Sequence, residues 1–245
     1  MNILAIETSN NICGAAIISD NKIIAEKNIF LPKNSSHKIF NIIKDITKKK
    51  LQFDAVAIDI GPGSFTGIRI GISLARAYGQ FINVPVVGIS SLDCLAFNAS
   101  GKKNISEKIF PIIDALRGDV YTARYERLNP TSCFVTSKPD LLRRKEQGIT
   151  KYGVKRKSEY QVVGIEKFLK MIDNKTTIVG SREICQQIPI NGICVEAKLS
   201  ASGVGFLALK KLSDHINDCK KYNYNKVLPL YIRKLFAQEH YKKSA

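Results

Sequence analysis

The side chains best suited to chemistry in this sequence lie in one stretch, DIGPGSFTGIRIG, which runs from Asp59 to Gly71. An apolar run, DAVAI, leads into the stretch, and a helix-like pattern leads out of it. Unpaired N–H groups at a helix N-terminus attract anions, and glycines let the backbone approach a phosphate closely. Hydroxyl and guanidinium groups can donate to the same anion. We therefore identify five candidate residues for binding a nucleotide or another anion: Gly61, Gly63, Ser64, Thr66 and Arg69.

The same loop is compatible with a tight structural turn that supplies its own helix cap. It is not a P-loop, because the Gly-Lys-Ser/Thr ending of that motif is absent. The helix dipole disfavours a cation in the first helical turn, so Arg69 fits better where it meets a phosphate or a partner's carboxylate. From the residues alone, the anion site and the structural turn both stay open.

A second polar group closes the apolar run at the start of the chain. Glu7, Thr8 and Ser9 follow ILAI just before an expected turn. A carboxylate and two hydroxyls at that place can hold a phosphate or magnesium, and they can equally satisfy backbone groups of the turn. Thr8 and Ser9 therefore join the candidate nucleotide- or anion-binding residues.

Histidine usage argues against several kinds of catalytic site. The three histidines, His37, His215 and His240, contain no pair at the i, i+4 spacing of a helical metal site. A G-x-S-x-G nucleophile elbow is also missing from the sequence. We therefore expect no catalytic residue and no metal site, which argues against a metallopeptidase. An independent ATPase or kinase would need a second glycine pair and a glycine beside Glu7, and it stays the alternative.

Composition limits the class of protein. Lys and Arg outnumber Asp and Glu by 38 to 21, which gives a formal charge of +17. Such a charge is compatible with nucleic acid as a partner, but the lysines are dispersed along the chain, so charge alone leaves that contact open. The first ten residues lack the basic region of a signal peptide, and no apolar run reaches the ~18 residues of a membrane helix. We expect a soluble, cytoplasmic protein without a membrane partner.

The six cysteines include no C-x-x-C pair, so a zinc ribbon or a redox motif is not expected. In a reducing cytosol the default is free, mostly buried thiols. We therefore expect all six cysteines to be free.

The elements that must position these residues alternate between strands and helices. Residues 2–30 predict three antiparallel strands with polar turns. Residues 35–51 predict an amphipathic helix capped by Ser35 or Ser36, and a buried strand at 53–60 leads to the glycine loop and its helix. A strand at 84–90 and a helix at 91–99 follow.

The pattern then restarts after a polar, aperiodic segment at 98–108. The expected elements are strands at 109–115, 117–128 and 176–180, and helices at 181–188 and 201–216. Residues 130–175 give no clear pattern. We therefore predict an α/β protein with two similar halves, 1–104 and 105–245, in which the last helix packs back on the first half.

The helix after the glycine loop carries small residues at every fourth position. Each glycine inside a helix costs up to about 1 kcal/mol relative to alanine, so a close backbone approach along the ridge should offset the cost. The approaching element can belong to this chain or to a second one. We identify candidate subunit-interface residues on the ridge and on the preceding helix: Gly67, Gly71, Ala75 and Gly79, and Ile39, Ile42, Ile43 and Ile46.

Five segments together resemble the TsaB (YeaZ-type) family of tRNA threonylcarbamoyladenosine biosynthesis proteins. They are ILAIETS, GPGSFTGIRIG, VGISSLDCLA, IDALRGDVYTARYER and LPLYIR, in the family's order and over nearly the whole chain. The resemblance implies an actin-like (ASKHA) fold of two related α/β halves, each with a mixed sheet flanked by helices. It also implies a non-catalytic subunit of the system that transfers a threonylcarbamoyl group to adenosine 37 of tRNA.

The partners implied by the resemblance are the catalytic paralogue TsaD and the ATPase TsaE, with a homodimer when the chain is alone. Contact with tRNA would be indirect or weak. Two departures from the family pattern concern ligands: His37 stands two residues beyond the position where relatives carry a histidine, and the adenosine-side glycine motif is reduced to Val179-Gly180-Ser181. We therefore expect no cofactor of the chain's own, and any nucleotide would be shared at the interface of the complex.

Overall fold

The N-terminal segment forms an antiparallel meander, as the sequence predicts. In the computed structural model, which describes residues 1–30, 38–47, 52–128, 153–188, 192–214 and 219–233, it consists of β1 (Asn2–Glu7), β2 (Ile12–Ser19) and β3 (Lys22–Phe30). Asp20 and Asn21, the two residues between β2 and β3, have φ angles of 47° and 62°. A two-residue turn with both φ angles positive matches the twist of the strands, and Asp and Asn tolerate that conformation. The turn therefore favours the observed hairpin.

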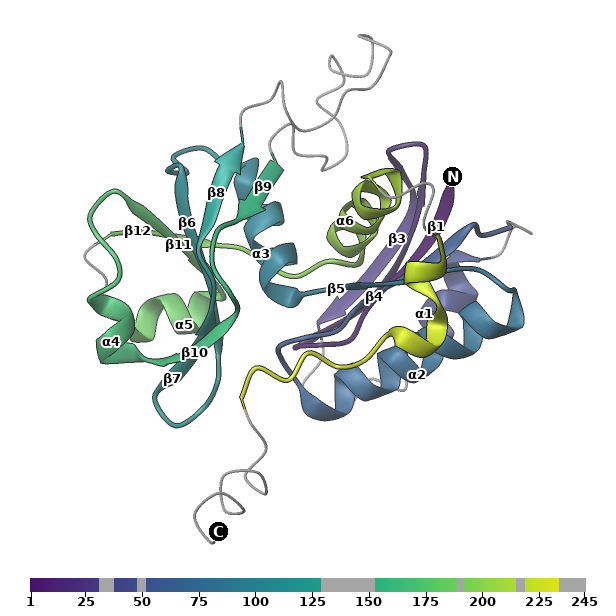
Figure 1. Cartoon of the computed structure of the whole chain (residues 1–245), viewed down its shortest axis with the longest axis horizontal. Helices are drawn as coiled ribbons and strands as arrows, with labels where there is room; N and C mark the ends of the chain where they lie inside the picture. Colours follow the sequence, from purple (N-terminus) through teal and green to yellow (C-terminus); the bar gives the residue numbers. More distant parts are fainter. Residues whose placement is uncertain (31–37, 48–51, 129–152, 189–191, 215–218, 234–245) are drawn as a thin grey trace, which may run out of the picture.

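Two parallel strands extend the meander into a five-stranded sheet of order β3-β2-β1-β4-β5, in which β4 is Ala55–Asp59 and β5 is Val86–Ile89. Helices α1 (Ile39–Ile46) and α2 (Phe65–Phe81) cover one face, and α6 (Ala201–Asp214) covers the other (Figure 1). Alternate residues of β1 point to opposite faces, and those between Asn2 and Glu7 are apolar and buried on both faces. The carboxyl ends of β1 and β4 therefore lie next to each other inside the molecule.

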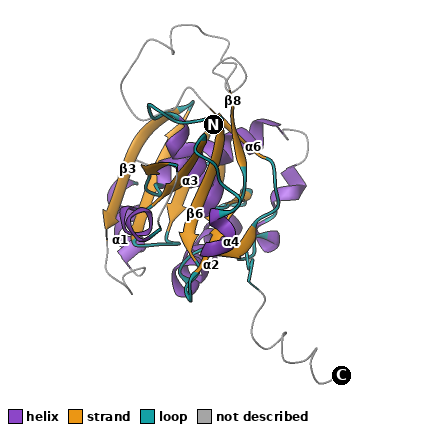
Figure 2. Ribbon diagram, turned by 90° about the vertical axis from the view of Figure 1, so that its left-hand side faces the viewer, coloured by secondary structure: helices purple, strands orange, loops and turns teal. Residues whose placement is uncertain are grey.

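The second sheet has seven strands and follows the path β10-β7-β6-β11-β12, with β8 pairing with β6 and β9. Its helices α4 (Ile165–Leu169) and α5 (Arg182–Gln187) pack against one face, and α3 (Ser91–Ser100) packs against β6, β9, β11 and α6. Helix α3 thus lies between the two sheets (Figures 1 and 2). The strands are β6 (Lys108–Asp114), β7 (Asp119–Thr122), β8 (Tyr125–Leu128), β9 (Gly153–Arg156), β10 (Gln161–Gly164), β11 (Thr176–Gly180) and β12 (Ile193–Glu196).

Three sequence-based expectations about these elements need correction. The single strand expected at 117–128 is two strands, because the chain leaves the ladder at Ala123 and the Arg124 N–H donates to Ser158 Oγ at 2.9 Å instead. The aperiodic segment expected at 98–108 begins inside α3, which continues to Ser100. Strands β9 and β10 and helix α4 lie within residues 130–175, for which we expected no regular elements. The division into halves at 104 and 105 stays a prediction.

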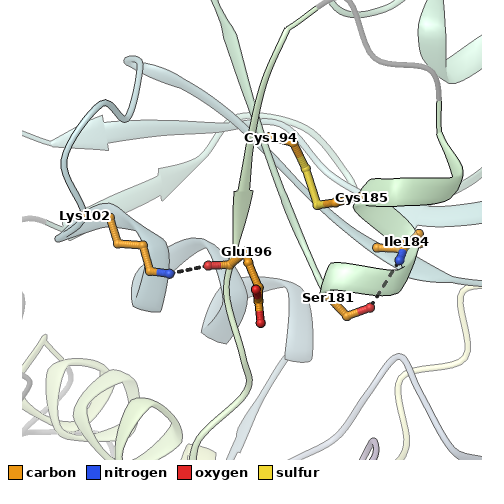
Figure 3. Close-up of a disulfide and its surroundings, with 6 residues drawn as sticks. All are labelled: Lys102, Ser181, Ile184, Cys185, Cys194 and Glu196. Atoms are coloured by element: carbon orange, nitrogen blue, oxygen red, sulfur yellow. Dashed lines mark hydrogen bonds between the residues drawn. A yellow bond between two sulfur atoms is a disulfide. The ribbon is translucent and has the colours of Figure 1, made fainter.

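The expectation of six free cysteines is wrong for two of them. Cys185 on α5 and Cys194 on β12 form a disulfide with a Cα–Cα distance of 6.3 Å (Figure 3). The β11–α5–β12 unit returns the chain beside its own helix, which brings the two residues within the range that a disulfide can span. Cys13 and Cys94 are free and buried, as expected. Cys133 lies outside the described residues, as do the proposed caps Ser35 and Ser36.

The small-residue ridge of α2 faces the chain's own first sheet. A Cβ at Gly71 would lie 2.2 Å from Thr8 Oγ1, and one at Gly79 would lie 2.3 Å from Val86 Cγ2. Ala75 is fully buried, and Gly67 is buried against the backbone of Thr8. Contacts within the chain therefore explain the small residues of the ridge.

The isoleucines of α1 also pack internally. Ile39, Ile42 and Ile43 are buried against the first sheet, and Ile46 packs at the edge of the same cluster. A partner can reach the exposed side chains of α1 and α2, which lie next to these buried residues in the sequence. A role of the buried isoleucines and ridge residues in a subunit interface stays a prediction.

We expect Ala75→Leu to lower the free energy of unfolding by about 1–3 kcal/mol, because the extra atoms overpack a fully buried contact between α2 and the sheet. Ala77→Leu is the matched control, since Ala77 is exposed on the same helix. Urea denaturation of both variants measures the difference. Equal stability of the two variants would contradict the internal role of the ridge.

Candidate functional site

Two acidic side chains meet at the carboxyl ends of β1 and β4. Glu7 and Asp59 are both fully buried, and the parallel register that pairs Ile6 with Ile58 brings them side by side. Glu7 Oε1 accepts hydrogen bonds from the N–H and the Oγ of Ser9, at 2.7 and 2.6 Å. Asp59 Oδ1 accepts from the Gly61 N–H at 2.7 Å and from Ser91 Oγ at 2.6 Å. The short β1–β2 turn and the start of α3 thus each hold one carboxyl group in place.

The other oxygen of each carboxyl group lacks a partner from the rest of the described chain. Glu7 Oε2 and Asp59 Oδ2 are buried and accept no hydrogen bond from another described residue. Burial raises the pKa of Glu7 well above its ordinary value of 4.5, and the charge of Asp59 raises it further. Burial also raises the pKa of Asp59, while hydrogen bonds, among them those from Ser91 Oγ and the Gly61 N–H, oppose that rise. The raised pKa favours the protonated form of Glu7, because a second negative charge beside Asp59 in a buried site is strongly unfavourable.

The glycine loop closes directly over this acid pair. A Cβ at Gly63 would lie 2.0 Å from the Ser9 carbonyl oxygen, and one at Gly67 would lie 2.0 Å from the Thr8 carbonyl oxygen. Within the same contact, the Ser64 N–H donates to the Ser9 carbonyl at 2.6 Å, and Thr8 Oγ1 donates to the Gly67 carbonyl at 2.8 Å. The glycines therefore allow a close approach of the β1–β2 turn of the same chain. This packing supports the structural-turn interpretation of the loop, and its role in anion binding stays a prediction.

The N-terminus of α2 is capped and exposed. Ser64 Oγ accepts from the Gly67 N–H at 3.3 Å, and Ser64 and Thr66 are open to solvent. The Arg69 guanidinium lies 3.6 Å from the centre of the Phe65 ring and donates to the Tyr231 hydroxyl at 3.1 and 3.2 Å. Two aromatic side chains thus stabilise the Arg69 cation, which the helix dipole disfavours at this position. One of them, Tyr231, lies 162 residues further along the chain.

The structure thus divides the predicted site residues into two groups. Thr8, Ser9, Gly61 and Gly63 surround the acid pair, whereas Ser64, Thr66 and Arg69 face solvent. Sequence reasoning missed Asp59 and Ser91 as parts of the site. A usable signal existed for Asp59, because it ends a buried parallel strand just as Glu7 does, and such strand ends meet at one edge of a sheet.

The adenosine-side position is also closely packed. A Cβ at Gly180 would lie 2.6 Å from Ile184 Cγ2, and Ser181 caps α5 by accepting from the Ile184 N–H at 3.4 Å (Figure 3). Among the residues that the structure describes, no group of three or more His, Cys, Asp or Glu could hold a metal ion. The three histidines lie outside those residues. No helix in the described ranges is long and apolar enough to span a bilayer.

Comparison with protein families gives a match over most of the chain. The model of the family described as "TsaD: tRNA N6-adenosine threonylcarbamoyltransferase" matches residues 31–241. The Bacillus subtilis protein named tRNA threonylcarbamoyladenosine biosynthesis protein TsaB is 36% identical over 133 residues, which is 53% of this chain and 57% of that protein. The Escherichia coli protein of the same name is 34% identical over 131 residues, 52% of this chain and 56% of that protein. The matched region therefore spans about half the length of these relatives.

Solved structures support the fold over nearly the whole length. A Pseudomonas aeruginosa protein described as similar to peptidase YEAZ aligns with a TM-score of 0.73 at 20% identity, covering 95% of this chain and 99% of that one. The structure titled YeaZ from Pseudomonas aeruginosa aligns with a TM-score of 0.71 at 20% identity, covering 94% of this chain and 99% of that one. The predicted α/β actin-like fold and the predicted resemblance to the TsaB (YeaZ-type) family are both confirmed.

We expect the stability of the protein to fall as pH rises above about 4.5, because Glu7 binds its proton in the folded state but loses it in the unfolded state. The contribution is complete below the unfolded pKa and is lost as pH rises toward the raised folded pKa, at up to about 1.4 kcal/mol per pH unit. Glu7→Gln keeps a neutral donor and should reduce this loss. Urea denaturation between acidic and neutral pH measures it, with Glu107→Gln, at an exposed carboxylate, as the control. A Glu7→Gln variant whose pH dependence equals that of the native protein would contradict the protonated state of Glu7 in the folded protein.

Proposed function

The chain belongs to the tRNA N6-adenosine threonylcarbamoyltransferase family, and from this premise we propose that it is a non-catalytic scaffold subunit required for threonylcarbamoyl transfer to adenosine 37 of tRNA. Its relatives in Bacillus subtilis and Escherichia coli carry names from the biosynthesis of that modified nucleoside. The catalytic subunit in this proposal is the paralogue TsaD, and the ATPase TsaE is the third protein. Contact of this chain with tRNA is indirect or weak.

The sealing of the acid pair is the observation that supports a non-catalytic role. An actin-like ATPase needs a carboxylate that reaches nucleotide-bound magnesium, but Glu7 and Asp59 are fully buried, and burial raises the pKa of both. The backbone of Thr8 and Ser9 occupies the space that the glycines leave open. A nucleotide in the complex would therefore meet the exposed start of α2, at Ser64 and Thr66, and would be shared with a partner.

The exposed sides of α1 and α2 are the proposed surface for TsaD, and for a second copy when the chain is alone. Phe81 at the end of α2 is 89% exposed, and Phe40 on α1 and Phe65 on α2 are both more than half exposed. Large aromatic side chains are costly to leave in water and are enriched at protein interfaces. Both helices rest on the first sheet through their buried sides, so the exposed rings lie on a rigid support.

Reconstitution with TsaD, TsaE, a threonylcarbamoyl donor and unmodified tRNA tests the proposal when one protein is omitted at a time. We expect threonylcarbamoyladenosine to form with all three proteins and to fall to background without this chain. Full product formation in its absence would refute the scaffold role. Multiple turnover of ATP by this chain alone, lost in Glu7→Gln, would instead support an independent ATPase of the actin-like fold.

The proposed surface makes a separate prediction about assembly. Phe81→Glu should weaken pairing with TsaD at least tenfold while leaving the melting temperature nearly unchanged, because the side chain is almost fully exposed in the single chain. Leu116→Glu is the control, since Leu116 is also exposed but lies in the turn between β6 and β7 of the second sheet. Calorimetric titration of TsaD into each variant measures the affinities. An equal loss of affinity for TsaD in both variants, or no loss in either, would show that the surface lies elsewhere.

A further inference from the structure

The last described segment of the chain, residues 227–233, runs from the first sheet to the second. It follows the short helix η5 (Tyr224–Lys226), which lies beside the C-terminal part of α2. In Figure 1 the segment leaves the α2 side of the first sheet and approaches the second sheet near β7. It is extended and contains no helix or strand of its own, so its position depends on the contacts at its two ends.

The first end of the segment is fixed to α2 and to the glycine loop. Val227 is buried in the cluster between α2 and the first sheet. The Leu230 N–H donates to the Ile60 carbonyl at 2.9 Å, and Ile60 stands between the buried Asp59 and Gly61. The Tyr231 hydroxyl accepts from the Arg69 guanidinium. This end therefore lies across the carboxyl end of β4.

The second end is fixed by one ion pair. Arg233 Nη2 donates to Asp119 Oδ2, and Asp119 is the first residue of β7 in the second sheet. The two side chains are 26% and 34% exposed. Between the two ends, Ile232 packs against the buried cluster that contains residues of both sheets. A partly exposed ion pair is weak and is screened by salt, so the Arg233 end opens more easily than the Val227 end.

The two sheets are also joined through α3, which packs between them and against α6, and through residues 197–200, which lead from β12 to α6. An additional attachment at a distant point restricts rotation of one sheet relative to the other. The segment supplies such an attachment, and it joins β7 directly to the loop that covers the acid pair.

We propose that residues 227–233 act as a releasable clasp that couples the second sheet to the glycine loop of the first. With the Arg233–Asp119 pair formed, the segment holds the Leu230–Ile60 hydrogen bond and keeps the loop closed over Glu7 and Asp59. With the pair broken, the segment loosens from its Arg233 end, and the loop loses an outer contact. The clasp depends on the fold alone, so it goes beyond the proposed scaffold function and does not depend on it.

Residue-resolved hydrogen exchange on the full chain tests the clasp. Asp119→Asn and Arg233→Gln should each speed exchange of the Leu230 and Gly61 amides by about two- to fivefold, the range expected for loss of a partly exposed ion pair. High salt should produce the same change in the native protein and little further change in the variants. The double variant Asp119→Arg with Arg233→Asp should restore slow exchange, because it re-forms the pair with the charges reversed.

Lys108→Gln is the matched control, since it breaks the Lys108–Asp173 ion pair, 3.1 Å long, inside the second half of the chain. It should leave the Leu230 and Gly61 amides unchanged. The clasp is refuted if the single variants change only the amides next to positions 119 and 233. It is also refuted if the double variant exchanges as fast as the single ones.

Discussion

The burial of two carboxyl groups side by side, at Glu7 and Asp59, is the constraint on which the rest of the structure depends. Glu7 and Asp59 end adjacent parallel strands with no exposure to water, so two negative charges there would be very unfavourable. The raised pKa of Glu7 favours its neutral, protonated form, which removes the repulsion. One oxygen of each carboxyl group, Glu7 Oε1 and Asp59 Oδ1, accepts hydrogen bonds from the rest of the chain. The donors belong to Ser9, Gly61 and Ser91. The β1–β2 turn, the glycine loop and the start of α3 are therefore drawn to one point.

The glycines of the loop and of α2 are explained by the same requirement. To seal the acid pair, the loop must touch the carbonyl oxygens of Thr8 and Ser9, and a side chain at Gly63 or Gly67 would leave no room for that contact. Further along α2, Gly71 and Gly79 keep the helix against β1 and β5. The described contacts of these glycines are therefore contacts of internal packing. They support the structural-turn interpretation of the motif, whereas its role in anion binding stays a prediction.

Much of the fold could be predicted from the sequence, because the information was local. The Asp20-Asn21 turn, the apolar alternation of β1 and the period of α1 each depend on a few neighbouring residues. The features that escaped prediction join distant parts of the chain. The acid pair requires knowing that β1 and β4 are neighbours, and the disulfide requires the return of β12 beside α5. Likewise, Tyr231, whose hydroxyl accepts a hydrogen bond from Arg69, lies 162 residues further along the chain. The spacing of residues within the loop therefore indicated an anion as the partner of Arg69.

The protonation state of Glu7 tests the account most directly, and carbon NMR of the side-chain carboxyl group measures it through a pH titration of the full chain. We predict that the Glu7 carboxyl signal keeps the position of a protonated acid well above pH 4.5. A Glu7 signal that titrates near pH 4.5 would show an ionised, solvated side chain. That result would contradict the sealed acid pair and reopen the site to magnesium and nucleotide.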